Sequence, residues 1–286
     1  MREAGTGRRL VIGAAMAVAQ LAAMASPAGA AVSIGQLPTG SPSTFCVSPV
    51  MQDYLQPTVT SGSTYVVPAN GTITSWSHSA NTSASQMLTF KVFRQVAGLT
   101  YMAVGHDGPR PLTSGTVNTF SGLSIPVRAG DVIGLHKPAP APACIFGVPG
   151  DSYIARNGNL SDGQQGDFAP SSDSRVNIAA TVNPDNGFGL IGTQRNRKKG
   201  TLTESFSLPN PGELTALGNG ARVAGAGART SKTVGSGTAQ LLIKAKGKKR
   251  RKLNETGKVK LTLTVTYTPT GGNPGTQKLK VKLLKR

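Results

Sequence analysis

The stretch Gly257–Lys285, "GKVKLTLTVTYTPTGGNPGTQKLKVKLLK", carries the clearest structural pattern in the chain. Apolar and polar residues alternate in its first half, and the alternation resumes after a break rich in Gly and Pro. The apolar set is Val259, Leu261, Leu263, Val265, Tyr267, Leu279, Val281 and Leu283, and the cationic residues between them are Lys258, Lys260, Lys278, Lys280 and Lys282. A period of two indicates strands with one buried and one solvated face. The stretch therefore predicts a β-hairpin in a two-sheet sandwich.

Similar strand signals precede this hairpin, in "TLTESFSL", "GELTALG" and "TAQLLIKAKG". About seven strands in about ninety residues are typical of an immunoglobulin-like sandwich. The cysteine pair and tryptophan of antibody domains are absent from this part of the sequence. We therefore expect a module that needs no disulfide.

The earlier part of the chain, residues 43–182, also consists of short strand signals separated by turns. Examples are "TYVVPANGTITSWSH", "QMLTFKVFRQ" and "IPVRAGDVIGLH". In the last of these, Arg128–Asp131 predicts a tight turn in which Gly130 supplies a positive φ. Eight or nine antiparallel strands indicate a jelly-roll-like sandwich, with Trp76 in its core. We expect a signal peptide (1–30), a disulfide-stapled jelly-roll-like domain (31–183), a linker (184–199) and a basic immunoglobulin-like domain (200–286).

Charge is distributed unevenly between these parts. Residues 193–286 contain 21 Lys and Arg against 3 Asp and Glu, a net charge of +18. Residues 31–192 contain 7 against 8, a net charge of −1. Such asymmetry predicts two modules with different roles, of which the second is attracted to polyanions.

The N-terminus has the pattern of an export signal. Arg2, Arg8 and Arg9 precede the apolar run "LVIGAAMAVAQLAAM", and the small residues Ala28–Ala30 follow it. This arrangement predicts cleavage after Ala30 or Ala31 and a location outside the cell or on its envelope. No other segment of the sequence is long and apolar enough to predict a membrane span.

The chain has two cysteines, Cys46 and Cys144, separated by 97 residues. In the oxidising compartment that an export signal implies, two thiols predict one disulfide. Closing so long a loop contributes about 4 kcal/mol in the chain-entropy model.

The stretches "RNRKKGTLTESFSLPNPGELTALGNG" and "LLIKAKGKKRRKLNETGKVKLTLTVTYTPTGG" resemble the basic immunoglobulin-like modules of exported proteins from high-GC actinobacteria. The earlier "ANGTITSW" and "IPVRAGDVIGLH" are similar to a sandwich domain that often precedes such modules. The resemblance implies architecture and compartment but no catalytic residues. Glu204 departs from it, because an apolar inward residue is usual there; an edge strand or a shifted register would explain the difference.

The run from Lys246 to Lys252 joins two predicted strands and is expected to be a solvated turn. Its candidate contacts to polyanions are Lys246, Lys248, Lys249, Arg250, Arg251 and Lys252. Anionic envelope polymers or lipid headgroups are the expected partners of this run. For the nearly uncharged domain 31–183, which we call the neutral domain, a carbohydrate or a protein is a further candidate partner. Specific nucleic-acid binding is not expected, since the aromatic residues of the basic module, Phe188, Phe206 and Tyr267, fit core positions better than stacking positions. The competing interpretation of the charge is a solvated surface and spacer.

Two groups of polar residues in the neutral domain are candidate metal ligands. Asp151, Asp162, Asp167 and Asp173 lie in an oxygen-rich loop region of the kind that holds Ca²⁺. His106 and Asp107, with His78 and His136 elsewhere, are candidate zinc ligands. The alternative for both groups is ordinary turn and loop chemistry, in which case no cofactor is needed.

Sequence signatures of enzymes are missing. The chain has no Gly-x-Ser-x-Gly, His-Glu-x-x-His or phosphate-loop motif, and no Glu lies between Ala31 and Gly192. We therefore expect an exported, non-enzymatic binding or adhesion protein whose basic module is a spacer and electrostatic tether. The alternatives are a hydrolase or other enzyme using the His/Asp loops, and a purely structural surface protein.

Overall fold

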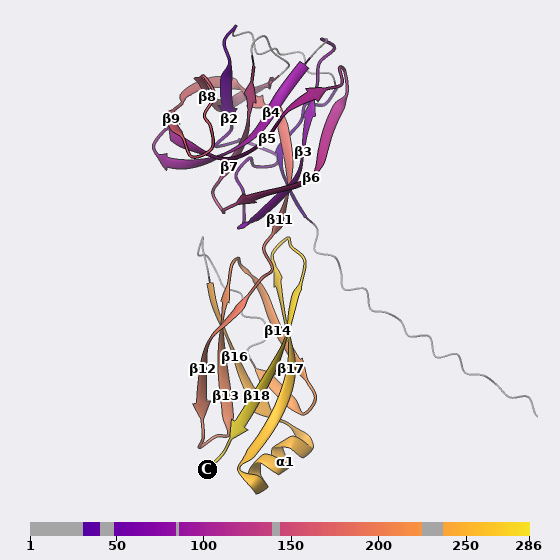
Figure 1. The fold of residues 1–286 in the computed structure, drawn as a ribbon, viewed down its shortest axis with the longest axis vertical. Coiled ribbons are helices and arrows are strands. Elements are labelled where there is room, and N and C mark those ends of the chain that lie inside the picture. The colour runs from indigo at the N-terminus through magenta and orange to yellow at the C-terminus, as the bar shows by residue number, and fades with distance from the viewer. Residues whose placement is uncertain (1–30, 41–48, 84–85, 139–143, 225–236) are drawn as a thin grey trace, which may run out of the picture.

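The computed structural model describes residues 31–40, 49–83, 86–138, 144–224 and 237–286. Within them the chain is an all-β protein with eighteen strands and one helix, arranged as two sandwiches that lie end to end (Figure 1). The predicted signal peptide and Cys46 lie outside the described residues. In the described part, no helix has the length and apolar character needed to cross a bilayer.

The first sandwich packs a four-stranded sheet against a seven-stranded sheet. The order in the first sheet is β1 (Val32–Gln36), β11 (Ile178–Pro184), β3 (Gly71–Ser79) and β6 (Val117–Val127). The order in the second is β10 (Ala169–Val176), β8 (Ile145–Asn157), β2 (Gln52–Leu55), β7 (Val132–Lys137), β4 (Gln86–Ala97), β5 (Thr100–Leu112) and β9 (Gln165–Asp167). All of the pairings are antiparallel. The described strands number eleven rather than the eight or nine expected, because pieces as short as β9 carry no periodic signal.

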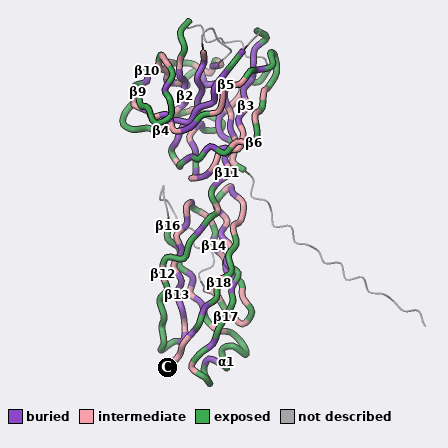
Figure 2. Tube along the Cα trace, in the orientation of Figure 1, coloured by how far each residue is buried: buried purple, intermediate pink, exposed green. Residues whose placement is uncertain are grey.

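The core between these sheets confirms two predictions. Trp76 is fully buried and stacks on Phe90 with 5.8 Å between ring centroids. The turn before β7 closes with a hydrogen bond from the Asp131 amide to the Arg128 carbonyl, and Gly130 has a φ of 93°. Buried residues line the space between the sheets, while the outer turns are exposed (Figure 2).

The second sandwich has four strands in one sheet and three in the other. Their orders are β12 (Gly189–Asn196), β13 (Thr201–Leu208), β16 (Gly237–Ala245) and β15 (Ala221–Ala224), and β14 (Gly212–Gly218), β17 (Lys258–Pro269) and β18 (Gly275–Leu284). The predicted hairpin is confirmed, since Leu261 faces Val281 in an antiparallel register and both side chains are buried.

The expected linker, and one of the two explanations offered for Glu204, are wrong. The segment 184–199, expected as a linker, contains β12, which pairs with β13 with one shift of register between Leu190 and Gly192. Glu204 is not on an edge strand, because β13 lies between β12 and β16. The side chain of Glu204 is buried and accepts a hydrogen bond of 2.5 Å from the Thr193 hydroxyl, the residue directly opposite it. This bond satisfies a polar group that would otherwise be costly to bury.

The expected turn at Lys246–Lys252 is also wrong, since the segment forms α1 (Gly247–Thr256). Lys, Arg and Leu are good helix formers, and Gly257, with a φ of 66°, provides the left-handed residue that ends the helix. Leu253 is the buried residue of α1 and joins the core of the second sandwich. A single apolar anchor in a basic segment gives no amphipathic period, so the sequence pattern did not reveal the helix.

Candidate polyanion-binding site

Cationic segments that are distant in the sequence meet at the far end of the second sandwich, around α1 and the C-terminus (Figure 1). Backbone hydrogen bonds hold these segments together. The amide of Arg286 donates to the carbonyl oxygen of Arg197 at 3.0 Å, and the amide of Lys246 donates to the carbonyl oxygen of Gly220 at 2.7 Å. We call this region the basic end. It comprises Arg197, Lys198, Lys199, Arg222, Lys244, Lys246, Lys248, Lys249, Arg250, Arg251, Lys252, Lys285 and Arg286.

The helix and its N-cap residue Lys246 contribute the six residues predicted as polyanion contacts, and all six are exposed. Its charge opposes its own dipole. The N-cap residue Lys246 makes no side-chain capping bond, the first turn has no acidic residue, and the last turn has no basic one. Cations at a helix N-terminus are unfavourable, because this end already carries partial positive charge. The helix therefore concentrates positive potential at a cost to its own stability.

The cations of the second sandwich are not neutralised by neighbouring carboxylates. All seven ion pairs among the described residues lie in the first sandwich. Of the 21 Lys and Arg residues in 193–286, only Arg229 and Lys232 lie outside the described part. The other 19 form no ion pair with a described residue. Their field is consequently available to an external anion.

Two grooves flank α1. One, of about 380 Å³, is lined by Lys199, Gly200, Thr201, Arg222, Lys244, Ala245, Arg250, Leu253, Asn254 and Lys285. The other, of about 780 Å³, is lined by Gly218–Ala221, Lys246–Lys249 and Lys260–Thr262. Neither lining includes an acidic residue. Both grooves can therefore receive negatively charged groups.

A second cationic surface covers the outside of the β17–β18 hairpin. It consists of the exposed side chains Lys258, Lys260, Lys278, Lys280 and Lys282, which we call the lysine face. Lys260 lies directly opposite Lys282 in the register. Like charges directly opposite one another destabilise a sheet, so this arrangement also favours a bound polyanion over an empty surface.

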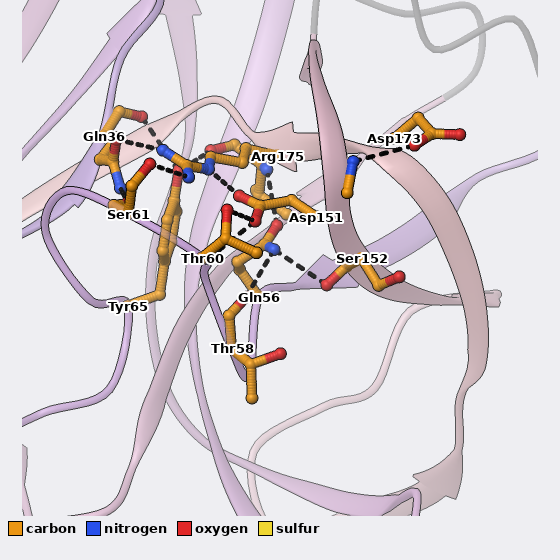
Figure 3. Close-up of polar contacts among 12 residues, drawn as sticks. Gln36, Gln56, Thr58, Thr60, Ser61, Tyr65, Asp151, Ser152, Asp173 and Arg175 are labelled. Atoms are coloured by element: carbon orange, nitrogen blue, oxygen red, sulfur yellow. Dashed lines mark hydrogen bonds and ion pairs between the residues drawn. The ribbon is translucent and has the colours of Figure 1, made fainter.

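The aspartates proposed as calcium ligands serve other purposes. Asp151 is buried in a polar network with Thr60 and Arg175 that links β8, β10 and the loop after β2 (Figure 3). Burial raises the pKa of Asp151, but the hydrogen bonds from Arg175 and Thr60 outweigh it and hold the pKa below its usual value. Arg175 also donates to the Gln36 side chain at 2.6 Å. The network binds the edges of the two sheets together.

The other three aspartates are exposed and have separate partners. Asp162 pairs with His106, Asp167 accepts from the Thr100 hydroxyl, and Asp173 accepts from the Gly150 amide. No group of three or more His, Cys, Asp or Glu side chains in the described part could hold a metal ion. The four candidate calcium ligands are thus not brought together there.

The proposed zinc ligands are likewise dispersed. Asp107 accepts hydrogen bonds from the Trp76 indole at 2.7 Å and from Arg110. His78 contacts the Asn177 carbonyl at 2.6 Å, His106 contacts Asp162 at 2.8 Å, and His136 contacts Asp53 at 2.9 Å. Each histidine therefore has its own partner, and no two of them share one.

Sequence reasoning missed a buried charged cluster in the first sandwich. Asp53, which is fully buried, contacts Lys91 at 3.0 Å and His136 at 2.9 Å, and accepts a third bond from the Leu160 amide at 2.8 Å. Lys91 also donates to the Asn159 side chain. Burial lowers the pKa of Lys91, against the opposing effect of Asp53. No motif could have revealed the cluster, since its members come from β2, β4, β7 and a loop.

The predicted disulfide falls partly outside the described residues. Cys144 is fully buried beside β8, and the described part contains no free cysteine. Cys46 is not among the described residues, so its bond to Cys144 stays a prediction.

Comparison with known proteins adds no functional assignment to this geometry. No protein-family model matches the chain, and no curated protein has a significantly similar sequence.

The sequence predicted only part of the basic end. Arg222, Lys244 and Lys285 were counted in the charge but not assigned to a site, because nothing local links them to α1.

Proposed function

We propose that this chain is an exported, non-enzymatic binding or adhesion protein whose second sandwich holds it on anionic polymers of the cell envelope. The observation that carries the proposal is the set of 19 described cations without an ion pair. A polyanion that neutralises such a surface releases its own condensed counterions, which favours binding. The uneven charge supports different roles for the two sandwiches: the second binds the envelope, and the first binds a carbohydrate or protein ligand.

We further propose that the second sandwich is immunoglobulin-like. Lettered A to G in chain order, its strands form the sheets ABED and CFG, the arrangement of constant-type immunoglobulin domains. The short helix α1 occupies the connection between strands E and F. A module of this kind would act as a spacer, since its charge lies at the end far from the first sandwich.

The first sandwich, which we take to be jelly-roll-like and stapled by Cys46 and Cys144, is proposed to present the binding surface for a carbohydrate or a protein. Its two sheets share four strands each with the eight-stranded jelly-roll plan; β8 and β10 are additions at the β2 edge of the larger sheet, and β9 is an addition at its β5 edge. Export through the N-terminal signal would place both sandwiches outside the cell.

The test is co-sedimentation of the mature protein, residues 31–286, with purified cell envelope across a salt series. We expect pelleting at low salt and release as salt rises, because the interaction is electrostatic. A variant with Gln at Lys248, Lys249, Arg250, Arg251 and Lys252 should pellet less and show a shallower salt dependence. Pelleting that neither salt nor this variant changes would contradict the tether.

A further inference from the structure

We infer that the 380 Å³ groove beside α1 is a discrete binding site for a phosphate group, which a phosphodiester of an anionic polymer or of a lipid headgroup supplies. This inference rests on the proposed function. It adds one defined contact to the general electrostatic attraction between the second sandwich and a polyanion. Five cations line the groove and come from five segments of the chain: Lys199, Arg222, Lys244, Arg250 and Lys285.

The geometry of the groove is fixed by packing. Gly200 has a φ of 65°, and a Cβ atom there would lie 3.0 Å from Leu253 and 3.2 Å from the Cβ atom of Lys285. Leu253 and Lys285 can therefore approach the backbone closely at this point. The ammonium group of Lys285 donates to the side chain of Asn254 at 2.7 Å, and both residues line the groove. Gly200, Leu253 and Lys285, which all line the groove, thus join the residue before β13, α1 and the C-terminal segment.

Without an anion, the groove is electrostatically unfavourable. Arg222 of β15 lies directly opposite Lys244 of β16 in the register, and like charges so placed destabilise a sheet. Neither of them forms an ion pair with a described residue. A bound anion between them would convert this repulsion into attraction.

The donor set favours phosphate over carboxylate. The two guanidinium groups, of Arg222 and Arg250, can each present paired N–H donors, the geometry that matches phosphate oxygens. Three ammonium groups add donors from other directions. A tetrahedral phosphate can accept hydrogen bonds from several sides at once, whereas a planar carboxylate offers two oxygens in one plane. The groove therefore suits a phosphate group held from several sides.

The test compares two full-length variants that lose the same charge. Arg222→Gln/Arg250→Gln removes two cations from the groove, and Lys278→Gln/Lys280→Gln removes two from the lysine face. Binding is measured by calorimetry at physiological salt with a glycerol-phosphate oligomer, and by flotation with phosphatidylglycerol vesicles. Both probes carry phosphodiesters, and the one that binds tells whether a polymer or a lipid headgroup supplies the phosphate. Circular dichroism checks that both variants are folded.

We expect the groove variant to lose affinity by about ten-fold or more, since charge-assisted hydrogen bonds are lost, and the lysine-face variant by about two- to three-fold through the weaker field. Equal losses in the two variants would overturn the phosphate site and leave the tether standing. A wild-type protein that binds neither probe, yet still pellets with envelope in a salt-dependent way, would also overturn the site. If it neither binds nor pellets, the proposed function itself is wrong.

Discussion

Asn70 and Asn210 bind each other reciprocally across the junction of the two sandwiches. The amide N–H of Asn70 donates to Oδ1 of Asn210 at 2.7 Å, and Nδ2 of Asn210 donates to the carbonyl oxygen of Asn70 at 2.8 Å. Asn210 is almost fully buried, and its backbone is hydrogen-bonded to the hydroxyl of Tyr267 in the core of the second sandwich. The pair therefore connects a turn of one sandwich to the interior of the other.

Replacing Asn210 with Ala should loosen this junction. The substitution leaves the Asn70 amide and the Asp185 carbonyl without their partner, at a cost of about 1–3 kcal/mol. We expect a lower urea midpoint, and small-angle X-ray scattering should report a broader distribution of distances between the sandwiches. Asn219→Ala, at an exposed position, is the matched control. Unchanged scattering in the Asn210 variant would show that other contacts alone set the junction.

Leu253 should determine whether α1 stays attached to the second sandwich. Its side chain is 3% exposed, and truncation to Ala should lower the free energy of unfolding by about 3 kcal/mol, as for other buried leucines. Leu217→Ala, where the side chain is 77% exposed, should change it by less than about 0.5 kcal/mol. Urea denaturation measures both values. Equal effects would mean that α1 contributes little to the core.

The lysine face should show a conflict between stability and binding. Lys282→Glu replaces the repulsion with Lys260 by a cross-strand ion pair, which should raise the free energy of unfolding by about 0.5 kcal/mol. The same substitution should weaken binding to a polyanion, because it replaces a positive charge by a negative one and so lowers the net charge by two. Lys282→Gln removes the repulsion alone and should give a smaller gain. Paired denaturation and binding assays check the trade-off; a Glu variant no more stable than wild type would contradict it.

Acid should destabilise the first sandwich through His78. Burial lowers the pKa of His78 to about 4, and its hydrogen bond to the Asn177 carbonyl only partly opposes this. Its unfolded pKa is near 6.5, so between pH 6.5 and 4 the unfolded chain binds the additional proton. Stability therefore falls as pH falls through this range, by up to about 3 kcal/mol at pH 4.

Urea denaturation at pH 7 and pH 5 measures this contribution. His78→Gln should reduce the difference in unfolding free energy between the two pH values, even if the variant is less stable overall. Asn219→Ala, at an exposed position without a titratable group, should keep the wild-type difference. If both variants retain it, other groups are responsible for the acid sensitivity.

Several features of the fold were accessible from the sequence. The alternation in Gly257–Lys285 predicted which residues of the last hairpin are buried, and the turn at Arg128–Asp131 and the core position of Trp76 were also predicted correctly. The expected linker was wrong, and so was the edge position, one of the two explanations offered for Glu204. In both cases the pairing of β12 with β13 decided the outcome, and β12 itself has exposed residues on both faces and so lacks a hydrophobic period.

What the sequence determined by itself is the β class, the alternation of buried and exposed positions, and the concentration of positive charge in the last third of the chain. These are local or compositional properties, since successive side chains of a strand point to opposite faces whatever their partners are. The tertiary structure alone decided that the basic run forms α1, that Arg222 faces Lys244, and that Lys199 and Lys285 line one groove with them. These contacts depend on strand register and on the packing of Leu253. The spacing of the contacting residues in the sequence predicts neither.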